Sequence, residues 1–197
     1  MGLALTCRLD LEDQSSITRT LEIVSKRFDG LDVLVANAVR WPTDAGGPLR
    51  DVSWNAWQRA VRTNIEGTAD TVRNALPHLA ASDAGRVVLV SSGVAREGMP
   101  GASAYATSKA ALEGLCAALK WETAAPGTLV NIVSPGFTET ENNLARFGDD
   151  VRQSVRARTP TGTLSTPEDV AAAVLFLGSP ANANITGAYL PVAGGIN

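Results

Sequence analysis

The stretch "GRVVLVSS" (residues 85–92) decides the fold class of this chain. It places four consecutive aliphatic residues between "GR" and two serines, without the polar alternation of a strand that has one wet face. Such a short, fully apolar run is typical of a strand covered on both faces, as in a parallel sheet with helices on each side. The segments "LDVLVANA" (31–38) and "LVNIVSPG" (129–136) repeat the pattern. The sequence thus predicts three such strands in one sheet.

Helical patterns separate these strands. Apolar side chains recur at helical spacing in four segments, residues 15–28, 53–82, 103–124 and 166–179. Gly30 is expected to end the first helix, and Thr166 to cap the last one with Pro167 at its first position. Shorter strands are expected at 4–11 and 187–195. Alternating strands and helices of these lengths predict an α/β fold, a parallel sheet wrapped by helices.

Size and composition exclude several classes of protein. The 197 residues fit one domain with a substantial core, and 45% hydrophobic with 19% charged residues is typical of a globular chain. A net charge of −3 without a basic cluster argues against nucleic-acid and membrane partners. No apolar run is long enough for a membrane span, and no secretory signal opens the sequence. Cys7 and Cys116 are expected to be free thiols, which favours the cytoplasm, and a single histidine leaves no metal-ligand cluster.

Chemistry is expected at the segment "SAYATSKAALEGL" (103–115), which places Tyr105 and Lys109 one helical turn apart. A tyrosine hydroxyl titrates at about 10, too high for a base at neutral pH, but an adjacent ammonium lowers that pKa. The pair is then able to exchange protons at about pH 7. Ser92 ends a strand thirteen residues earlier, at the sheet edge where ligands bind in open parallel sheets. Its hydroxyl is expected to bond the substrate oxygen.

A set of motifs in fixed order resembles the short-chain dehydrogenase/reductase family. The motifs are Asp10, "NA" (37–38), "TNIEG" (63–67), "SS" (91–92), "YATSK" (105–109), "PGFTET" (135–140) and "ITG" (185–187). The resemblance implies a Rossmann-like three-layer sandwich with a mostly parallel sheet, and an oxidoreductase that acts on a carbonyl or alcohol substrate with NAD or NADP. It also implies a homo-oligomer, a dimer or tetramer, in which helices 53–82 and 103–124 form the main interface.

The same resemblance assigns roles to individual residues. The catalytic group would be Ser92, Tyr105 and Lys109, with Asn64 holding a water of the proton relay. Tyr105 would exchange a proton with the substrate oxygen, and Lys109 would also bind the nicotinamide ribose. Further contacts to the dinucleotide would come from Asp10, Asn37, Ala38, Pro135, Gly136, Phe137, Thr138 and Thr140.

The chain departs from the family pattern in two places. The glycine-rich turn that meets the pyrophosphate, G-x-G-x-x-G or T-G-x-x-x-G-x-G, does not occur, and Val39 replaces a usual glycine. The chain is therefore expected to be a single incomplete domain, 1–197, shortened at its N-terminus and without the family's first two strands. In this fold those strands lie between the third and fourth. Either the segment 4–9 then pairs beside 31–38, or 31–38 is an exposed edge that favours oligomerisation.

Of three functions, the sequence favours the first and leaves the other two as alternatives. The first is an oxidoreductase with the catalytic group named above. The second is a non-redox acid–base enzyme, a dehydratase, isomerase or cyclase, which needs the hydroxyls and the lysine but no phosphate-binding turn. The third is a non-catalytic partner subunit, which has no need of all four catalytic positions. The substrate and the choice between NAD and NADP do not follow from the sequence.

Structural roles are the alternatives for several of these residues. Asp10 is able to end a strand and cap the next helix, and Asn37 and Asn64 are able to satisfy backbone groups between strands. Of the two serines, Ser91 is expected to be structural. Trp41 is expected either to pack in the core or to overhang the mouth of the site.

Overall fold

The computed structural model describes residues 3–41, 43–123 and 127–196. Its sheet has four strands, in the spatial order β1 (Val33–Ala36), β2 (Arg86–Val90), β3 (Leu129–Pro135) and β4 (Tyr189–Val192). All three neighbouring pairs are parallel, and Val88 on β2 lies opposite Val35 on β1 and Asn131 on β3. The three apolar segments and the last short strand are therefore confirmed as neighbours in one parallel sheet.

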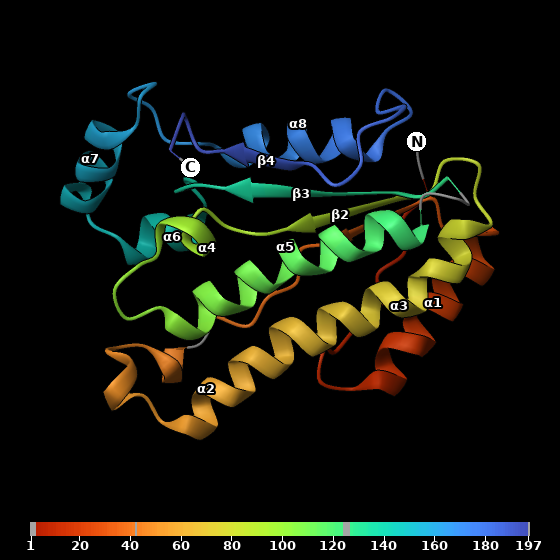
Figure 1. Cartoon of the computed structure of the whole chain (residues 1–197), viewed down its shortest axis with the longest axis horizontal. Coiled ribbons are helices and arrows are strands. Elements are labelled where there is room, and N and C mark those ends of the chain that lie inside the picture. The colour runs from red at the N-terminus through yellow and green to blue at the C-terminus, as the bar shows by residue number, and fades with distance from the viewer. Residues whose placement is uncertain (1–2, 42, 124–126, 197) are drawn as a thin grey trace.

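Helices cover both faces of this sheet (Figure 1). The helices are α1 (Gln14–Phe28), α2 (Trp54–Val61), α3 (Gly67–Ala80), α4 (Val94–Glu97), α5 (Ser103–Thr123), α6 (Glu141–Arg146), α7 (Asp149–Arg158) and α8 (Pro167–Gly178). Helix α8 lies on one face, whereas α1, α3 and α5 lie on the other. The arrangement confirms the predicted three-layer α/β sandwich of Rossmann-like type.

The core consists of two apolar layers, one on each side of the sheet. Strand β2 is buried along its whole length and supplies both layers, because successive side chains point to opposite faces. Leu89 packs with Ile17 and Leu79 on the side of α1, α3 and α5, whereas Val88 packs with Leu177 on the side of α8. The uninterrupted apolar run that predicted this strand thus reflects burial on two faces.

The ends of two helices follow the chemistry of their terminal residues. The Thr166 side chain accepts a hydrogen bond from the Asp169 amide, the Asp169 carboxylate accepts one from the Thr166 amide, and Pro167 takes the first helical position. Helix α1 ends where Asp29 adopts a left-handed conformation with φ of 60°. Gly30 follows with φ of 140°, which a residue with a side chain rarely adopts.

The predicted strand at 4–11 is wrong. None of residues 3–11 belongs to a strand. Some backbone groups of this segment instead form hydrogen bonds with side chains of helix α1. The Thr20 hydroxyl donates to the Arg8 carbonyl at 2.8 Å, and the Asp10 amide donates to the Ser16 hydroxyl at 3.1 Å. An extended segment becomes a strand only beside another strand, and none adjoins it in the described part of the chain. The segment 4–9 does not pair with β1, which forms the edge of the sheet.

The apolar spacing of segment 53–82 predicted one regular α-helix, and this prediction is wrong. A π-helical segment, η3 (Arg62–Glu66), separates α2 from α3, and it contains Asn64. Directly after it, the backbone of Leu11 lies so close to Gly67 that a Cβ there would sit 2.4 Å from the Leu11 carbonyl oxygen. Single turns of π-helix frequently occur at functional sites, because they re-aim the side chains of a helix.

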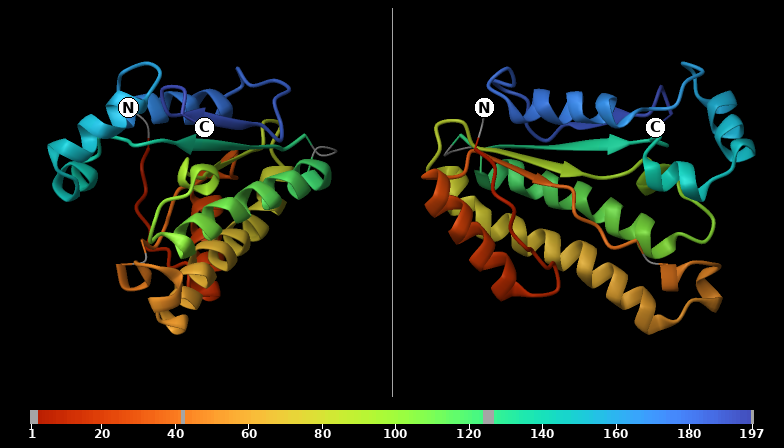
Figure 2. Two further views of the ribbon diagram at one scale, coloured as in Figure 1. Left: turned by 60° about the vertical axis from the view of Figure 1, so that its left-hand side comes forward. Right: turned by 180° about the vertical axis from the view of Figure 1, so that it is seen from behind.

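The carboxyl ends of the strands point toward α4, α6 and α7, where the connecting segments open (Figures 1 and 2). In open parallel sheets this edge is where ligands bind. The same edge carries Ser92 after β2 and Gly136 after β3. No helix among the described residues is long and apolar enough to cross a membrane.

Candidate active site

Two adjacent serines follow strand β2, and the structure separates their roles. Ser91 is buried, and its hydroxyl donates to the backbone carbonyl of Lys109 at 3.0 Å, which joins β2 to α5. Ser92 is half-buried and lines a cavity, and its oxygen accepts a hydrogen bond of 3.3 Å from the Val94 amide. These contacts agree with a structural Ser91 and leave Ser92 facing the cavity.

Lys109 is a buried cation next to Tyr105 on helix α5. Only 5% of its surface is exposed, and its ammonium donates to the Val90 carbonyl at 2.6 Å. The Nζ atom lies 6.0 Å from the centre of the Tyr105 ring. Burial lowers the pKa of Lys109 to about 8. An ammonium has three donors, so this side chain has capacity for oxygens of a ligand in the cavity that it lines.

The expected lowering of the Tyr105 pKa by Lys109 does not occur in this arrangement. Burial raises the pKa of Tyr105 above its ordinary value, and a hydrogen bond with Ser92 acts in the opposite direction to a smaller extent. The ammonium is directed at the Val90 carbonyl, so desolvation of the phenol dominates. Tyr105 is therefore a neutral phenol at pH 7, a form suited to donating a proton.

Asn64 is held by the backbone of the chain segment after β1. Its Oδ1 accepts from the Arg40 amide at 2.8 Å, and its Nδ2 donates to the Arg40 carbonyl at 3.0 Å. Nδ2 also lies 3.4 Å from the hydroxyl of Ser108 on α5. The side chain is buried and lines neither of the two cavities described below. These contacts support the structural alternative, and the water-holding role stays a prediction.

The predicted site residues converge on one cavity of about 540 Å³ at the carboxyl edge of the sheet. Segments far apart in the sequence form its walls, from the ends of β1, β2 and β3 to helix α5. The predicted residues that line it are Asn37, Ser92, Tyr105, Lys109, Pro135, Gly136, Phe137, Thr138 and Thr140. Asp10, Ala38 and Asn64 do not line it.

Asp10 lies in the turn before α1. Its Oδ1 accepts from the Glu12 amide at 3.0 Å, and its carboxylate lies 3.6 Å from the guanidinium of Arg8. Asp10 therefore neither ends a strand nor caps α1, whose N-cap is Asp13, so the structural alternative is wrong in this form. The cofactor contact stays a prediction. Ala38 follows Asn37, whose amide donates to the Val35 carbonyl at 3.1 Å.

The segment 135–140 forms a tight wall of this cavity. A Cβ on Gly136 would lie 2.7 Å from the Cβ of Ala193, so only glycine fits between β3 and β4 at this point. The Thr138 hydroxyl donates to the Gly136 carbonyl at 3.2 Å, and the Thr140 hydroxyl caps α6 by accepting from Asn143. The Glu139 amide also donates to the Ser165 carbonyl at 2.8 Å, so hydrogen bonds within the segment and to other parts of the chain fix this wall.

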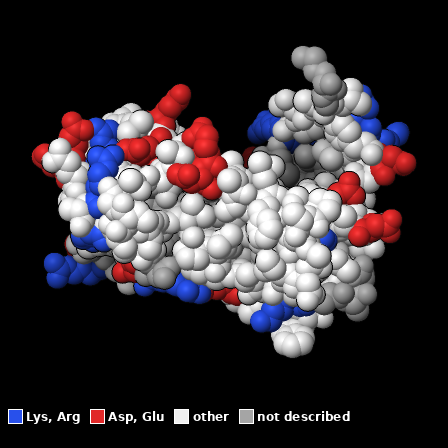
Figure 3. Space-filling model, turned by 90° about the horizontal axis from the view of Figure 1, so that it is seen from above, with Lys and Arg blue, Asp and Glu red and all other residues white. Residues whose placement is uncertain are grey.

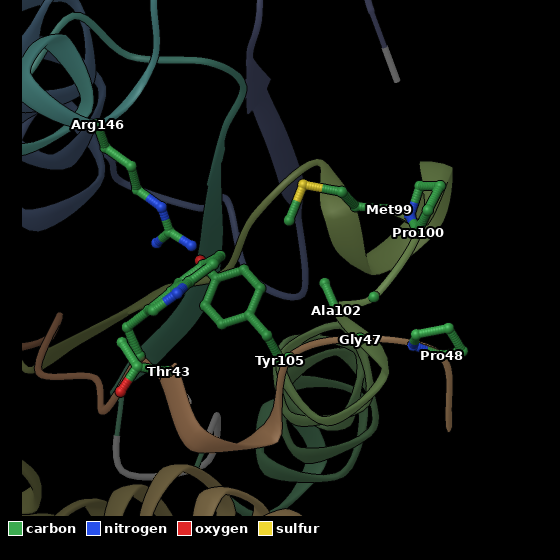
Figure 4. Close-up of a pocket in the computed structure, with 11 residues that line it drawn as sticks. Thr43, Gly47, Pro48, Met99, Pro100, Ala102, Tyr105 and Arg146 are labelled. Atoms are coloured by element: carbon green, nitrogen blue, oxygen red, sulfur yellow. The ribbon is translucent and has the colours of Figure 1, made fainter. Parts of the chain in front are cut away.

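A second cavity of about 430 Å³ adjoins the first on another side of Tyr105 (Figure 4). Trp41, Met99, Pro100 and Tyr105 line both cavities, whereas Lys109 lines only the larger one. The Trp41 ring centre is 4.5 Å from that of Tyr105, and the Arg146 guanidinium lies 4.6 Å from the Trp41 ring centre. Trp41 overhangs the site, as one of its two alternatives predicted.

The sequence did not point to Met99, Pro100 or Arg146 as site residues. The "GMPG" turn at 98–101 is a signal that a loop follows the strand of Ser92, but not that it folds over Tyr105. Arg146 lies in the polar segment 137–165, which has no motif. Its position follows only from the packing of α6 beside Trp41.

Comparisons with known proteins agree with this geometry. A family model described as "Enoyl-(Acyl carrier protein) reductase" matches residues 1–197. The chain is 36% identical over 192 residues to cis-4-hydroxycyclohexanecarboxylate dehydrogenase of Sinomonas cyclohexanicum, an alignment covering 98% of this chain and 76% of that protein. It is 34% identical over 193 residues to a 3-oxoacyl-[acyl-carrier-protein] reductase of Aquifex aeolicus, covering 95% and 74%.

A solved structure shows the same fold in a protein of similar sequence. The crystal structure of a dehydrogenase/reductase from Sinorhizobium meliloti 1021 superposes with a TM-score of 0.90 at 34% identity, covering 100% of this chain and 75% of that one. The full-length family match, these relatives and the shared fold lead to one conclusion. This chain belongs to the short-chain dehydrogenase/reductase family.

Proposed function

We propose that this short-chain oxidoreductase interconverts a carbonyl group and an alcohol, with NAD or NADP as the redox partner. The observation that carries the proposal is the position of Tyr105, which lines both cavities. Its neutral phenol lies beside the buried Lys109, and Ser92 lines the larger of the two cavities. A bound nicotinamide would supply or accept the hydride in the larger cavity.

Side chains of this site would transfer the proton and bind the substrate oxygen. In reduction, the Tyr105 hydroxyl donates its proton to the carbonyl oxygen as negative charge develops there. The Ser92 hydroxyl donates a hydrogen bond to the same oxygen and stabilises that charge. Lys109, whose ammonium is directed at the Val90 carbonyl and not at the phenol, would bind the nucleotide beside Tyr105 through its remaining donors.

The residues that line the larger cavity fit the nicotinamide end of a dinucleotide. The buried ammonium of Lys109 is directed at one backbone carbonyl and offers further donors to vicinal hydroxyls. Gly136 lines the cavity at the end of β3, and Asn37 supplies an amide from the end of β1. The 197 residues hold no glycine-rich turn for the pyrophosphate, so polar groups that line the larger cavity, such as Thr138 and Thr140, would bind that part.

Titration with NADH and with NADPH tests cofactor binding, followed by nicotinamide fluorescence. We expect a saturable signal with at least one of the two, and loss of that signal in Lys109→Met. Binding by neither nucleotide would contradict the redox proposal and favour the non-redox acid–base alternative. The same comparison distinguishes NAD from NADP, which the described residues do not decide.

We further propose that the chain forms a homo-oligomer, a dimer or a tetramer. In the part of the chain that the structure describes, no strand pairs with the outer side of β1. Large apolar side chains are also exposed on three helices: Trp54 on α2 (61%), Trp121 on α5 (81%) and Leu175 on α8 (71%). Figure 3 shows that charged side chains gather toward the ends of the face over α8 and leave its centre largely uncharged. Sedimentation velocity is expected to give at least twice the mass of one chain, and a single-chain mass would contradict this.

The single domain and cytoplasmic location stay predictions.

A further inference from the structure

The smaller cavity has an apolar body and a charged group on one side. Its walls include Trp41, Pro48, Met99, Pro100 and Ala102, and Arg146 is the one charged side chain among the described residues that line it. A close contact between two loops fixes one wall, since the Gly47 amide donates to the Gly101 carbonyl at 3.0 Å. The volume of about 430 Å³ is at the low end for small-molecule sites, which favours a compact ligand over a long chain.

Arg146 differs from two of the three arginines on α7, Arg152 and Arg156. The third, Arg158, lines the larger cavity. Arg152 pairs with Asp149 and Arg156 pairs with Glu139, whereas no carboxylate of the described residues lies within 4.0 Å of Arg146. Its guanidinium lies over Trp41 and is directed toward the cavity (Figure 4). The fork of N–H donors is therefore available to a ligand that carries an acceptor pair.

The distances set the scale of such a ligand. The guanidinium is 4.6 Å from the Trp41 ring centre, which is 4.5 Å from the Tyr105 ring centre, so guanidinium and phenol ring lie within about 9 Å of each other. A molecule held by both groups would span one carbon ring or a short chain. Glu97, an acidic side chain of the larger cavity, does not line the smaller one, so an anion is better placed beside Arg146.

From this geometry we infer that the substrate is a small hydroxy- or oxo-carboxylic acid whose carboxylate is bound by Arg146. An apolar ring or short chain lies on Trp41 and Met99, and the reacting carbon faces Tyr105. A planar guanidinium pairs with a carboxylate through two parallel hydrogen bonds. A phosphate dianion fits less well, because the described lining of this cavity holds no second cation. The identity of the reacting carbon rests on the proposed function, but the carboxylate site does not.

Steady-state rates with matched acids and amides test the selectivity. The substrates are 4-hydroxycyclohexanecarboxylate and its carboxamide, which differ in charge but hardly in shape. We expect the wild type to prefer the acid, and Arg146→Gln to lower kcat/KM for the acid by about ten- to a hundredfold while the amide changes little. Controls are Arg158→Gln, an arginine of the larger cavity, and Arg19→Gln, an exposed arginine on α1. An unchanged preference in Arg146→Gln, or its loss in Arg158→Gln instead, would overturn the assignment.

Calorimetry with cyclohexanecarboxylate, which has no hydroxyl to oxidise, makes the test independent of turnover. We expect wild type, Arg158→Gln and Arg19→Gln to bind the acid, Arg146→Gln to bind it at least tenfold more weakly, and none to distinguish strongly among uncharged amides. Arg146-dependent binding without NAD(P)-linked turnover would leave this site standing and refute the proposed function. NAD(P)-linked turnover without Arg146-dependent binding would support the proposed function and refute the carboxylate site at Arg146.

Discussion

Replacing Tyr105 by phenylalanine is expected to lower kcat/KM for carbonyl reduction by about 10²- to 10⁴-fold, the range that general acid catalysis contributes. The substitution removes only the hydroxyl, so the ring contact with Trp41 at 4.5 Å remains and the fold is expected to stay intact. Because burial raises the pKa of Tyr105, the phenol is protonated at pH 7 and ready to donate. Alcohol oxidation needs the phenolate instead, so its rate in the wild type is expected to rise with pH.

The second tyrosine provides a matched control. The Tyr189 hydroxyl lies 2.7 Å from the Ser134 hydroxyl on the neighbouring strand, and Tyr189 lines neither cavity. Tyr189→Phe is expected to cost stability but to keep the activity within a fewfold of the wild type. Equal activity in Tyr105→Phe and Tyr189→Phe, measured at the nicotinamide absorbance, would rule out proton transfer by Tyr105.

Replacing Lys109 by methionine is expected to abolish most of the activity and to change how stability depends on pH. The pKa of this lysine falls from 10.5 to about 8 on folding, because burial disfavours the charged form. Between these values the unfolded chain binds more protons than the folded one, so the free energy of unfolding rises with pH across this window. The lysine contributes roughly 3 kcal/mol to that rise in the free energy of unfolding. Below pH 8 the lysine is charged in both states, so the cost of burying its charge lowers the stability in full.

Denaturant unfolding at pH 7 and pH 10 measures this effect as a difference between variants. The wild type is expected to gain stability relative to Lys109→Met over this interval, because other titrating groups are common to both proteins. Lys120→Met, on the same helix but only partly buried, is expected to follow the wild type. If the wild type and Lys109→Met change in parallel, Lys109 is not a buried cation that titrates near pH 8.

The sequence predicted those parts of the fold in which local pattern and tertiary burial agree. The run at 87–90 is apolar because both of its faces are covered, and α5 repeats its buried positions with helical period. The segment 4–11 has a strand-like composition, but a strand also needs a neighbour, which composition does not encode. The π-helical turn at 62–66 could not be predicted from the sequence either, because its apolar spacing barely differs from that of an α-helix.

The candidate site was predictable where one short segment holds its parts. Tyr105 and Lys109 lie on the same turn-to-turn row of α5, so their proximity follows from helix geometry alone. The direction of the Tyr105 pKa shift was not predictable, because it depends on the burial of the phenol and on the carbonyl that attracts the Lys109 ammonium. Arg146 was not predictable either, since it lies forty-one positions after Tyr105 in the sequence.

Hydride transfer itself is the central claim, and isotope transfer measures it most directly. The protein would be incubated with cyclohexanone or 4-oxocyclohexanecarboxylate and with NADH or NADPH carrying deuterium at C4 of the nicotinamide. Mass spectrometry of the alcohol is expected to find one deuterium on the carbinol carbon in the wild type, and almost none in the Tyr105→Phe reaction over the same time. An absence of deuterium from every product of the wild type would contradict the account.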